Sequence, residues 1–237
     1  MLIGFPQLLD KVNEHIDRLD YAREPMNLYE PVKYILALGG KRIRPVMMLM
    51  AYNMYRDDVD KILDPALALE IYHNFTLLHD DLMDNADVRR GKPTVHKRWD
   101  ANTAILSGDV MLSLADVYMS RIDDAYFRQV MATFHQTSIE IAEGQQYDMD
   151  FETRTDVAEQ EYIEMIRLKT SVLLACALKI GAILGGASED DAAHLYRLGE
   201  CIGLAFQLRD DYLDVYGDPK VFGKKIGGDI LCNKKTY

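Results

Sequence analysis

The sequence predicts an all-α protein, and three observations support this fold class. Apolar residues recur at spacings of three and four along nearly the whole chain, as one buried helix face requires. No stretch of useful length alternates apolar and polar residues as a half-buried strand would. The chain has 237 residues, 49% of them hydrophobic, which is enough for one substantial core. We therefore predict a single helical domain over residues 1–237.

Proline and glycine divide the first third of the chain into helices. Pro25 marks a break before a second helix, which ends at Gly39-Gly40. Pro45 falls early in a third helix, where its missing N–H costs little. Asp64-Pro65 is typical of an N-cap followed by proline at the first helical position, so it predicts the start of a long fourth helix. The first helix has an apolar face made of Leu8, Leu9, Val12, Ile16 and Leu19.

The remaining boundaries come from the same residue types. The stretch Arg89-Arg90-Gly91-Lys92-Pro93 predicts a stop after the fourth helix, and Gly217-Asp218-Pro219 predicts the end of the last one. Between these two stops, apolar periodicity predicts helices over residues 101–119, 125–150, 157–169, 170–184 and 189–216.

Composition excludes several classes of function. A net charge of -11 disfavours general nucleic-acid binding. Cys176, Cys201 and Cys232 are widely spaced, so they indicate neither a disulfide framework nor a zinc site, and we expect a reducing, cytoplasmic setting. The longest apolar run, residues 172–187, carries Lys179 and is shorter than the roughly 20 residues that a membrane span needs. We expect no membrane span.

Two acidic blocks carry the strongest functional signal. Asp80-Asp81-Leu82-Met83-Asp84 and Asp210-Asp211-Tyr212-Leu213-Asp214 each place two carboxylates at i and i+4, one helical turn apart. Like charges at this spacing repel, so a hard cation such as Mg²⁺ is the obvious neutraliser. One block alone is as compatible with a solvated acidic face as with a metal site. Two blocks, both within apolar helical sequence, favour metal binding.

Basic groups supply complementary anion sites. Lys41, Arg42 and Arg44 stand where a Gly-rich loop enters a helix, and the free N–H groups and dipole of a helix start also favour an anion. A solvated loop is the alternative for such a run. His73 lies seven residues before Asp80, near the same helix face, although a lone histidine is more often a core residue.

Further cations and polar groups follow each acidic block. Arg89 and Arg90 lie one to three helical turns past the first block, where they suit phosphate oxygens. Lys169-Thr170 falls between two helical patterns, and Gln207 precedes Asp210 by three residues on the same face. Lys224 follows in a Gly-rich loop. Carboxylate pairs, Mg²⁺ and separate cations together imply two phosphorylated ligands.

The motifs GGKRIRP, HNFTLLHDDLMDNADVRRGKPTVH, LSGD, EGQQYD, LKT, FQLRDDYLD and GDPKVFGKKIGGDI occur in this order between residues 39 and 237. In these motifs the chain resembles the trans-isoprenyl diphosphate synthases, or polyprenyl synthetases. The resemblance implies an isoprenoid synthase type helical bundle around a central cavity. It also implies a homodimeric enzyme, with three Mg²⁺ ions per active site, that joins isopentenyl diphosphate head to tail to an allylic diphosphate.

The resemblance also implies roles for matched positions. The implied isopentenyl diphosphate ligands are Lys41, Arg44, His73 and Arg90. The implied allylic ligands are Arg89, Lys169, Thr170, Gln207 and Lys224, of which Lys169, Thr170 and Gln207 also serve catalysis. The implied metal ligands are Asp80, Asp84 and Asp210, with Asp81, Asp211 and Asp214 in support.

Departures from the family pattern concern the end of the chain and the product. Asn233 replaces the usual glycine before Lys234, and the domain looks as if it lacks its C-terminal helices. The first acidic block lacks the two-residue insertion of bacterial farnesyl diphosphate synthases, which leaves chain length open. Tyr72 and Phe75 precede Asp80 at helical spacing and predict a shallow floor for the growing chain. We therefore expect a farnesyl (C15) or geranylgeranyl (C20) product, although ordinary core packing is the alternative for both aromatics.

Three other classes of function remain open from the sequence. A class I terpene cyclase would need one acidic block and no isopentenyl site, whereas this chain has two blocks and the Gly39–Pro45 cluster. A non-catalytic subunit of a heteromeric synthase commonly loses acidic residues, and both blocks are intact here. A metal-free helical scaffold would make every cluster a coincidence.

Overall fold

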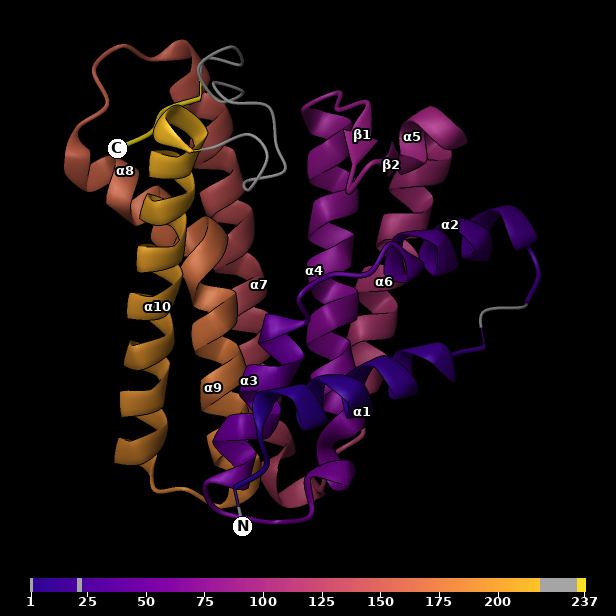
Figure 1. Cartoon of the computed structure of the whole chain (residues 1–237), viewed down its shortest axis with the longest axis vertical. Coiled ribbons are helices and arrows are strands. Elements are labelled where there is room, and N and C mark those ends of the chain that lie inside the picture. Colours follow the sequence, from indigo (N-terminus) through magenta and orange to yellow (C-terminus); the bar gives the residue numbers. More distant parts are fainter. Residues whose placement is uncertain (1, 21–22, 218–233) are drawn as a thin grey trace. The chain divides into compact units, whose positions relative to one another are not determined.

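The structure is a computed structural model that describes residues 2–20, 23–217 and 234–237 (Figure 1). The α-helices are α1 (Phe5–Asp17), α2 (Met26–Ala37), α3 (Ile43–Asn53), α4 (Leu63–Met83), α5 (Val95–Arg98), α6 (Ala101–Met119), α7 (Asp124–Thr153), α8 (Glu159–Ile166), α9 (Val172–Gly185) and α10 (Glu189–Tyr216). A 3₁₀ turn, Val59–Ile62, precedes α4, and a π-helical segment, Arg167–Ser171, joins α8 to α9. The predicted all-α class is confirmed.

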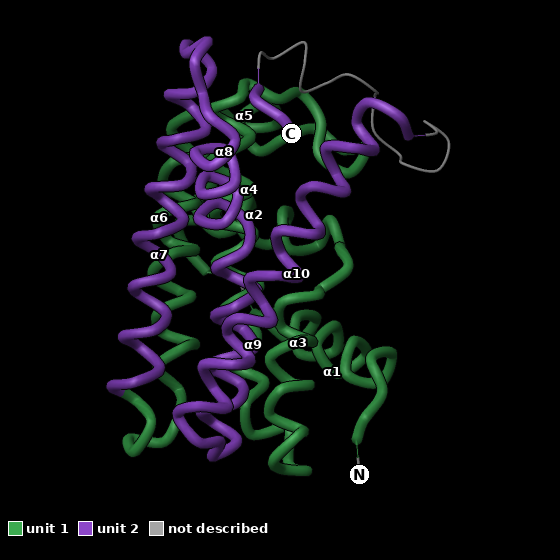
Figure 2. The backbone as a smooth tube through the Cα atoms, turned by 90° about the vertical axis from the view of Figure 1, so that its left-hand side faces the viewer, with its two compact units in different colours: residues 1–127 green, residues 128–237 purple. Residues whose placement is uncertain are grey.

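The chain divides into two compact units, residues 1–127 and 128–237, and the boundary falls within α7 (Figure 2). Each acidic block belongs to a different unit, the first to residues 1–127 and the second to residues 128–237. The prediction of one functional domain stays a prediction.

In the first unit, α4 is the central helix. It packs along α6 and also contacts α1, α2 and α3 (Figure 1). Most of its length is buried because its sequence is apolar on several sides, with Ala66, Leu67, Leu69 and Ile71 all nearly inaccessible. The α6 backbone comes close at Gly108, where a methyl group would overlap the ring of His79. This packing fixes the end of α4 that carries the first acidic block.

In the second unit, α9 is buried along its whole length and packs against α10. Two α10 glycines allow this close approach, because a methyl group on Gly199 would overlap Ala175 and one on Gly203 would overlap Ser171. Among the described residues, the helical stretch Glu159–Gly185 is long and apolar enough to cross a membrane. Because 83% of its most apolar window is buried, it matches the core helix of a folded domain, and it is weak evidence for a span.

The predicted helices agree with the structure to within a few residues, except around α4; Leu19, predicted on the first helix, lies beyond the end of α1 at Asp17. The prediction that Asp64 caps α4 is wrong, since the 3₁₀ turn leads directly into the helix and Ile62 occupies the N-cap. Asp64 lies in the first turn, where its carboxylate accepts hydrogen bonds from His15 (2.7 Å) and Arg121 (3.1 Å). Within the described residues, two short strands that the periodicity did not predict, β1 (Val88–Arg89) and β2 (Lys92–Pro93), form an antiparallel hairpin.

Candidate functional site

The first acidic block lies at the C-terminal end of α4. The helix ends at Met83, Asp84 is its C-cap, and the Asp84 N–H donates to the Asp80 carbonyl oxygen at 2.9 Å. The helical turn between the two residues is therefore intact, so both side chains leave the same side of the helix. Asp80 is partly buried and Asp84 is exposed. This arrangement suits a shared cation that also needs access to substrate.

Asp81 has a different environment from its two neighbours in the block. It is buried, and its Oδ2 accepts a hydrogen bond from Arg89 Nε at 2.7 Å, while Arg89 Nη2 lies 3.8 Å from Asp80. Burial raises the pKa of Asp81, and the charge and hydrogen bond of Arg89 oppose that rise. Asp81 thus holds Arg89 against the acidic block, and a direct role in metal binding stays a prediction.

The hairpin after α4 determines where Arg89 and Arg90 lie. The expectation that both continue past the acidic block by helical turns is wrong, because α4 stops at Met83 and the chain turns back through β1 and β2. Arg90 (φ 51°) and Gly91 (φ 74°) adopt left-handed conformations at the turn. Arg90 Nη1 donates a hydrogen bond to the Gly39 carbonyl oxygen. The hairpin therefore brings Arg90 to the Gly-rich loop that precedes α3.

That loop and α4 surround a concentrated positive charge. Lys41 is exposed, while Arg44 is partly buried in the first turn of α3. Burial lowers the pKa of Arg44 to about 10, and the nearby Glu70 charge opposes this shift. The pKa of His73 is well below its usual value, because of burial first and then the charges of Arg44 and Arg90. His73 is therefore neutral near pH 7 and can offer one ring N–H to an anion.

The structure shows a role for Arg42 that the sequence did not. The sequence predicts Arg42 as an anion ligand beside Lys41 and Arg44, but its side chain turns inward and is buried. Its Nη1 donates to Glu70 Oε1 at 2.6 Å. Glu70 itself could have been noticed, because it is a charged residue within a long apolar run of α4 and needs a buried partner.

In the second unit, four side chains form a hydrogen-bonded chain at the second acidic block. The Tyr162 hydroxyl donates to Asp211 Oδ2, and Gln207 Nε2 donates to Asp211 Oδ1 at 3.0 Å. Thr170 Oγ1 donates to Gln207 Oε1 at 3.2 Å. The buried Asp211 carboxylate thus fixes the orientation of the Gln207 amide, so that its oxygen faces Thr170. Asp214 is also buried, while Asp210 is partly exposed.

Lys169 and Thr170 lie in the π-helical segment, a backbone form that is rare and often found at functional sites. Lys169 Nζ lies 2.7 Å from Asp148 Oδ2. The segment approaches α7 at Gly144, where a methyl group would overlap the Lys169 backbone. The sequence motif EGQQYD contains both Gly144 and Asp148, but the sequence alone indicates no role for either residue.

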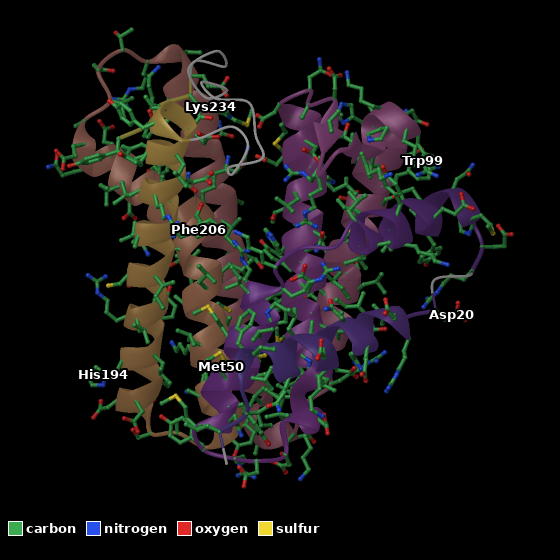
Figure 3. All side chains as sticks on the ribbon, viewed as in Figure 1. Asp20, Met50, Trp99, His194, Phe206 and Lys234 are labelled. Atoms are coloured by element: carbon green, nitrogen blue, oxygen red, sulfur yellow. The ribbon has the colours of Figure 1, made fainter. Side chains whose placement is uncertain are left out.

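Lys234 joins the same carboxylate. Its Nζ lies 2.8 Å from Asp148 and 2.8 Å from Glu152, both on α7 (Lys234 is labelled in Figure 3). Burial opposes ionisation of Asp148, but the charges of Lys169 and Lys234 hold its pKa below the usual value. Two cations therefore gather here despite the substitution of Asn233 for glycine. The predicted ligand Lys224 lies outside the described residues.

Each acidic block can supply part of the coordination shell of Mg²⁺, but it is not a complete metal site. Among the described residues, no three histidine, cysteine, aspartate or glutamate side chains gather at one point. Mg²⁺ commonly takes only one or two protein carboxylates and completes its shell with water and substrate phosphate oxygens. Asp80 and Asp84 on α4, and Asp210 and Asp214 on α10, supply such oxygen donors at i and i+4.

The helical fold, the paired carboxylates and the separate groups of cations define a class: all-α enzymes that act on diphosphate esters with a divalent metal. The chain belongs to the polyprenyl synthetase family, whose model matches residues 25–237. The family assignment made from the sequence is thereby confirmed, and with it the enzyme class, a trans-prenyltransferase.

Individual relatives agree with this assignment. The chain is 44% identical to a geranylgeranyl diphosphate synthase of Methanosarcina mazei, over 95% of this chain and 70% of the relative. It is 41% identical to a short chain isoprenyl diphosphate synthase of Methanocaldococcus jannaschii, over 97% of this chain and 69% of the relative.

Solved structures show the same similarity. A crystal structure of a geranylgeranyl pyrophosphate synthase has a TM-score of 0.95 and 52% identity, over 99% of this chain and 72% of that one. A geranylgeranyl pyrophosphate synthetase from Pyrococcus horikoshii has a TM-score of 0.92 and 38% identity, over 98% of this chain and 72% of that one. The chain thus spans about 70% of the length of the relatives it matches.

Proposed function

We propose that the protein condenses isopentenyl diphosphate with an allylic diphosphate and releases a C15 to C20 trans-prenyl diphosphate, with geranylgeranyl diphosphate favoured by the relatives. The positive charge gathered in the first unit supports this proposal: Arg90 donates to the Gly39 carbonyl oxygen, in the loop that leads to Lys41, and the charges of Arg44 and Arg90 help to lower the pKa of His73. An enzyme that only ionises an allylic diphosphate would not need this additional anion site. This argues against a class I terpene cyclase.

The chemistry requires stabilisation of a leaving diphosphate. Breaking the allylic C–O bond produces a delocalised carbocation and a diphosphate anion, so catalysis depends on groups that bind the anion more tightly in the transition state. When bound, Mg²⁺ would neutralise part of this developing charge at the acidic blocks. In our proposal Lys169 and Lys224 hold the remaining diphosphate oxygens, and Arg89 adds its charge beside the first block.

Bond formation then needs orientation more than a protein nucleophile. The Gln207 amide oxygen and the Thr170 hydroxyl form an electron-rich pair in the second unit. We assign them to face the carbocation and shield it from water. The isopentenyl double bond attacks the cation and forms the new C–C bond. The departed diphosphate then accepts the proton lost from the condensed product, which restores the double bond.

Incubation with both substrates tests the function directly. The protein is combined with isopentenyl diphosphate, Mg²⁺ and each allylic primer in turn, and the products are sized by chromatography. We expect a product one or more C5 units longer than the primer. Cyclic hydrocarbon formed without isopentenyl diphosphate would indicate a terpene cyclase, and activity only after addition of a second protein would indicate a subunit of a heteromeric synthase.

The basic groups are expected to divide by substrate. Lys41→Ala, Arg44→Ala and His73→Ala each remove a contact to isopentenyl diphosphate, worth about 1.5 to 3 kcal/mol for a charged partner. Each should raise the KM for isopentenyl diphosphate by about tenfold or more and change that for the allylic substrate little. Lys169→Ala and Lys224→Ala should have the opposite pattern. Saturation curves for each substrate measure the division, and the reverse pattern would contradict the assignment.

We further propose that three Mg²⁺ ions serve each active site and that the enzyme is cytoplasmic.

We also propose that the enzyme acts as a homodimer. Leu106 and Val117 are 57% and 49% exposed on α6, and they lie about three turns apart on one side of the helix. Leu106 also lines a cavity of about 390 Å³ between α2 and α6. Sedimentation equilibrium should give twice the mass of the chain, and Leu106→Arg should shift this toward one chain. A single-chain mass for the unmodified protein would contradict the homodimer.

A further inference from the structure

A buried polar cluster ties the loop before α3 to the middle of α4. Arg42 Nη1 donates to Glu70 Oε1 at 2.6 Å, and Arg42 Nη2 donates to the Leu36 carbonyl oxygen at 2.7 Å. Asn74 Nδ2 donates to Glu70 Oε1 at 2.9 Å and to the Glu70 carbonyl oxygen at 2.8 Å. The side chains of Arg42 and Glu70 are only 4% and 2% exposed, and Asn74 is fully buried. The three residues therefore form a closed cluster that solvent does not reach.

Such a cluster stabilises a fold poorly, because removing two charges from water has a large free-energy cost. A well-packed apolar pair of the same size often gives equal or greater folding stability. The best-supported benefit of a buried polar cluster is a unique local geometry. What this cluster fixes is an irregular backbone. Gly39 (φ 77°), Gly40 (φ 148°) and Arg42 (φ 47°) all have positive φ, and for arginine this conformation persists only when the surroundings enforce it.

The enforced conformation determines where the proposed substrate ligands lie. With Arg42 pointing inward, Lys41 is left exposed on the loop and Arg44 enters the first turn of α3. The same loop offers the Gly39 carbonyl oxygen to Arg90, and Gly40 leaves room for its guanidinium, since a methyl group there would lie 2.9 Å from Arg90 Nη2. Glu70 and Asn74, which hold the loop through Arg42, lie on α4, the same helix that carries His73.

We propose that Arg42, Glu70 and Asn74 are positioning residues that hold the Gly39–Arg44 loop in the conformation that binds isopentenyl diphosphate, without touching the substrate themselves. The inference rests on the proposed function. Glu70 also acts on the nearby arginines. Burial lowers the pKa values of Arg44 and Arg90, and the negative charge of Glu70 raises them again in part. It thereby helps to keep both guanidinium groups charged.

The test compares Glu70→Gln and Arg42→Met with a matched control, Asp64→Asn. Asp64 is also a carboxylate of α4 that pairs with an arginine, Arg121, but at the opposite end of the helix from the acidic block. Each test variant should raise the KM for isopentenyl diphosphate by about tenfold or more, and the KM for the allylic substrate by less than about twofold. The control should lower the melting temperature without changing either KM.

A double variant distinguishes positioning by the ion pair from a general loss of packing. Glu70→Gln leaves the Arg42 charge buried without its partner, and Arg42→Met does the same to Glu70, whereas the combination removes both charges. The double variant should therefore have a smaller rise in KM than the product of the two single rises. Arg42→Lys keeps the positive charge but cannot bind Glu70 and the Leu36 carbonyl oxygen through two separate guanidinium nitrogens. It provides a milder variant if a single neutral substitution prevents folding.

Calorimetric binding of isopentenyl diphosphate separates the inference from the proposed function. If the unmodified protein neither binds this ligand nor forms product, the proposed function fails and the inference fails with it. If the unmodified protein binds it and the folded variants bind it equally well, only the inference is overturned. An equal rise in the KM for both substrates would also overturn it, because that result indicates a global rather than a local defect.

Discussion

Asp80→Ala and Asp210→Ala should each lower turnover by about 10³-fold, equivalent to about 4 kcal/mol of transition-state stabilisation. Each change removes a carboxylate from an i, i+4 pair and so weakens the hold on a divalent cation that neutralises the leaving diphosphate. The adjacent carboxylates Asp81 and Asp211 are poor substitutes, since both are buried and hydrogen-bonded, to Arg89 and Gln207 respectively.

The measurement is the rate of product formation at saturating substrates and Mg²⁺, together with circular dichroism to confirm unchanged helicity. Asp190→Ala provides the matched control, because Asp190 is an exposed carboxylate in the first turn of the same helix as Asp210. It should retain normal turnover. Full activity of the unmodified protein in excess EDTA would show that the metal assignment is wrong.

Local geometry explains what could be predicted from the sequence. The helices follow from apolar periodicity, and the predicted range 101–119 coincides with α6. The pairing of Asp80 with Asp84 also needs only the repeat of a helix, so five residues of sequence were enough. Both features depend on neighbours in the chain.

Features that depend on distant partners were missed. Arg42 looks like an anion ligand beside Lys41, and only its pairing with Glu70, 28 residues away, shows that it turns inward. The hairpin after α4 is too short for strand periodicity to show, so the sequence predicts a helix that continues to Arg89. The role of Asp148 follows from contacts with Lys169 and with Lys234, 86 residues further along the chain. Residue spacing along the sequence does not indicate which of these distant residues contact one another in the folded chain.

The second large effect concerns product length, and it depends on two aromatic rings of α4. Phe75 lies about 7.5 Å and Tyr72 about 12 Å down the helix from Asp80, at a rise of about 1.5 Å per residue. Their ring centroids are 5.5 Å apart in an edge-to-face arrangement, and the Phe75 ring also contacts His79 at 4.8 Å. Tyr72 is buried, whereas Phe75 is only partly buried and lies nearer the acidic block. In our proposal this stack is the floor that stops the growing hydrocarbon.

Phe75→Ala should therefore shift the main product from C15 or C20 to C25 or longer, and the double change with Tyr72→Ala should shift it further. The single variant is the decisive one, because removal of a buried aromatic side chain costs about 3 to 5 kcal/mol of folding stability and Tyr72 is nearly inaccessible. Leu77→Ala is the matched control, since Leu77 is partly buried on α4 but about 200° around the helix from Phe75. Chromatography of the dephosphorylated products measures the outcome. An unchanged chain length for Phe75→Ala, in a protein that still condenses its substrates, would place the floor on other residues.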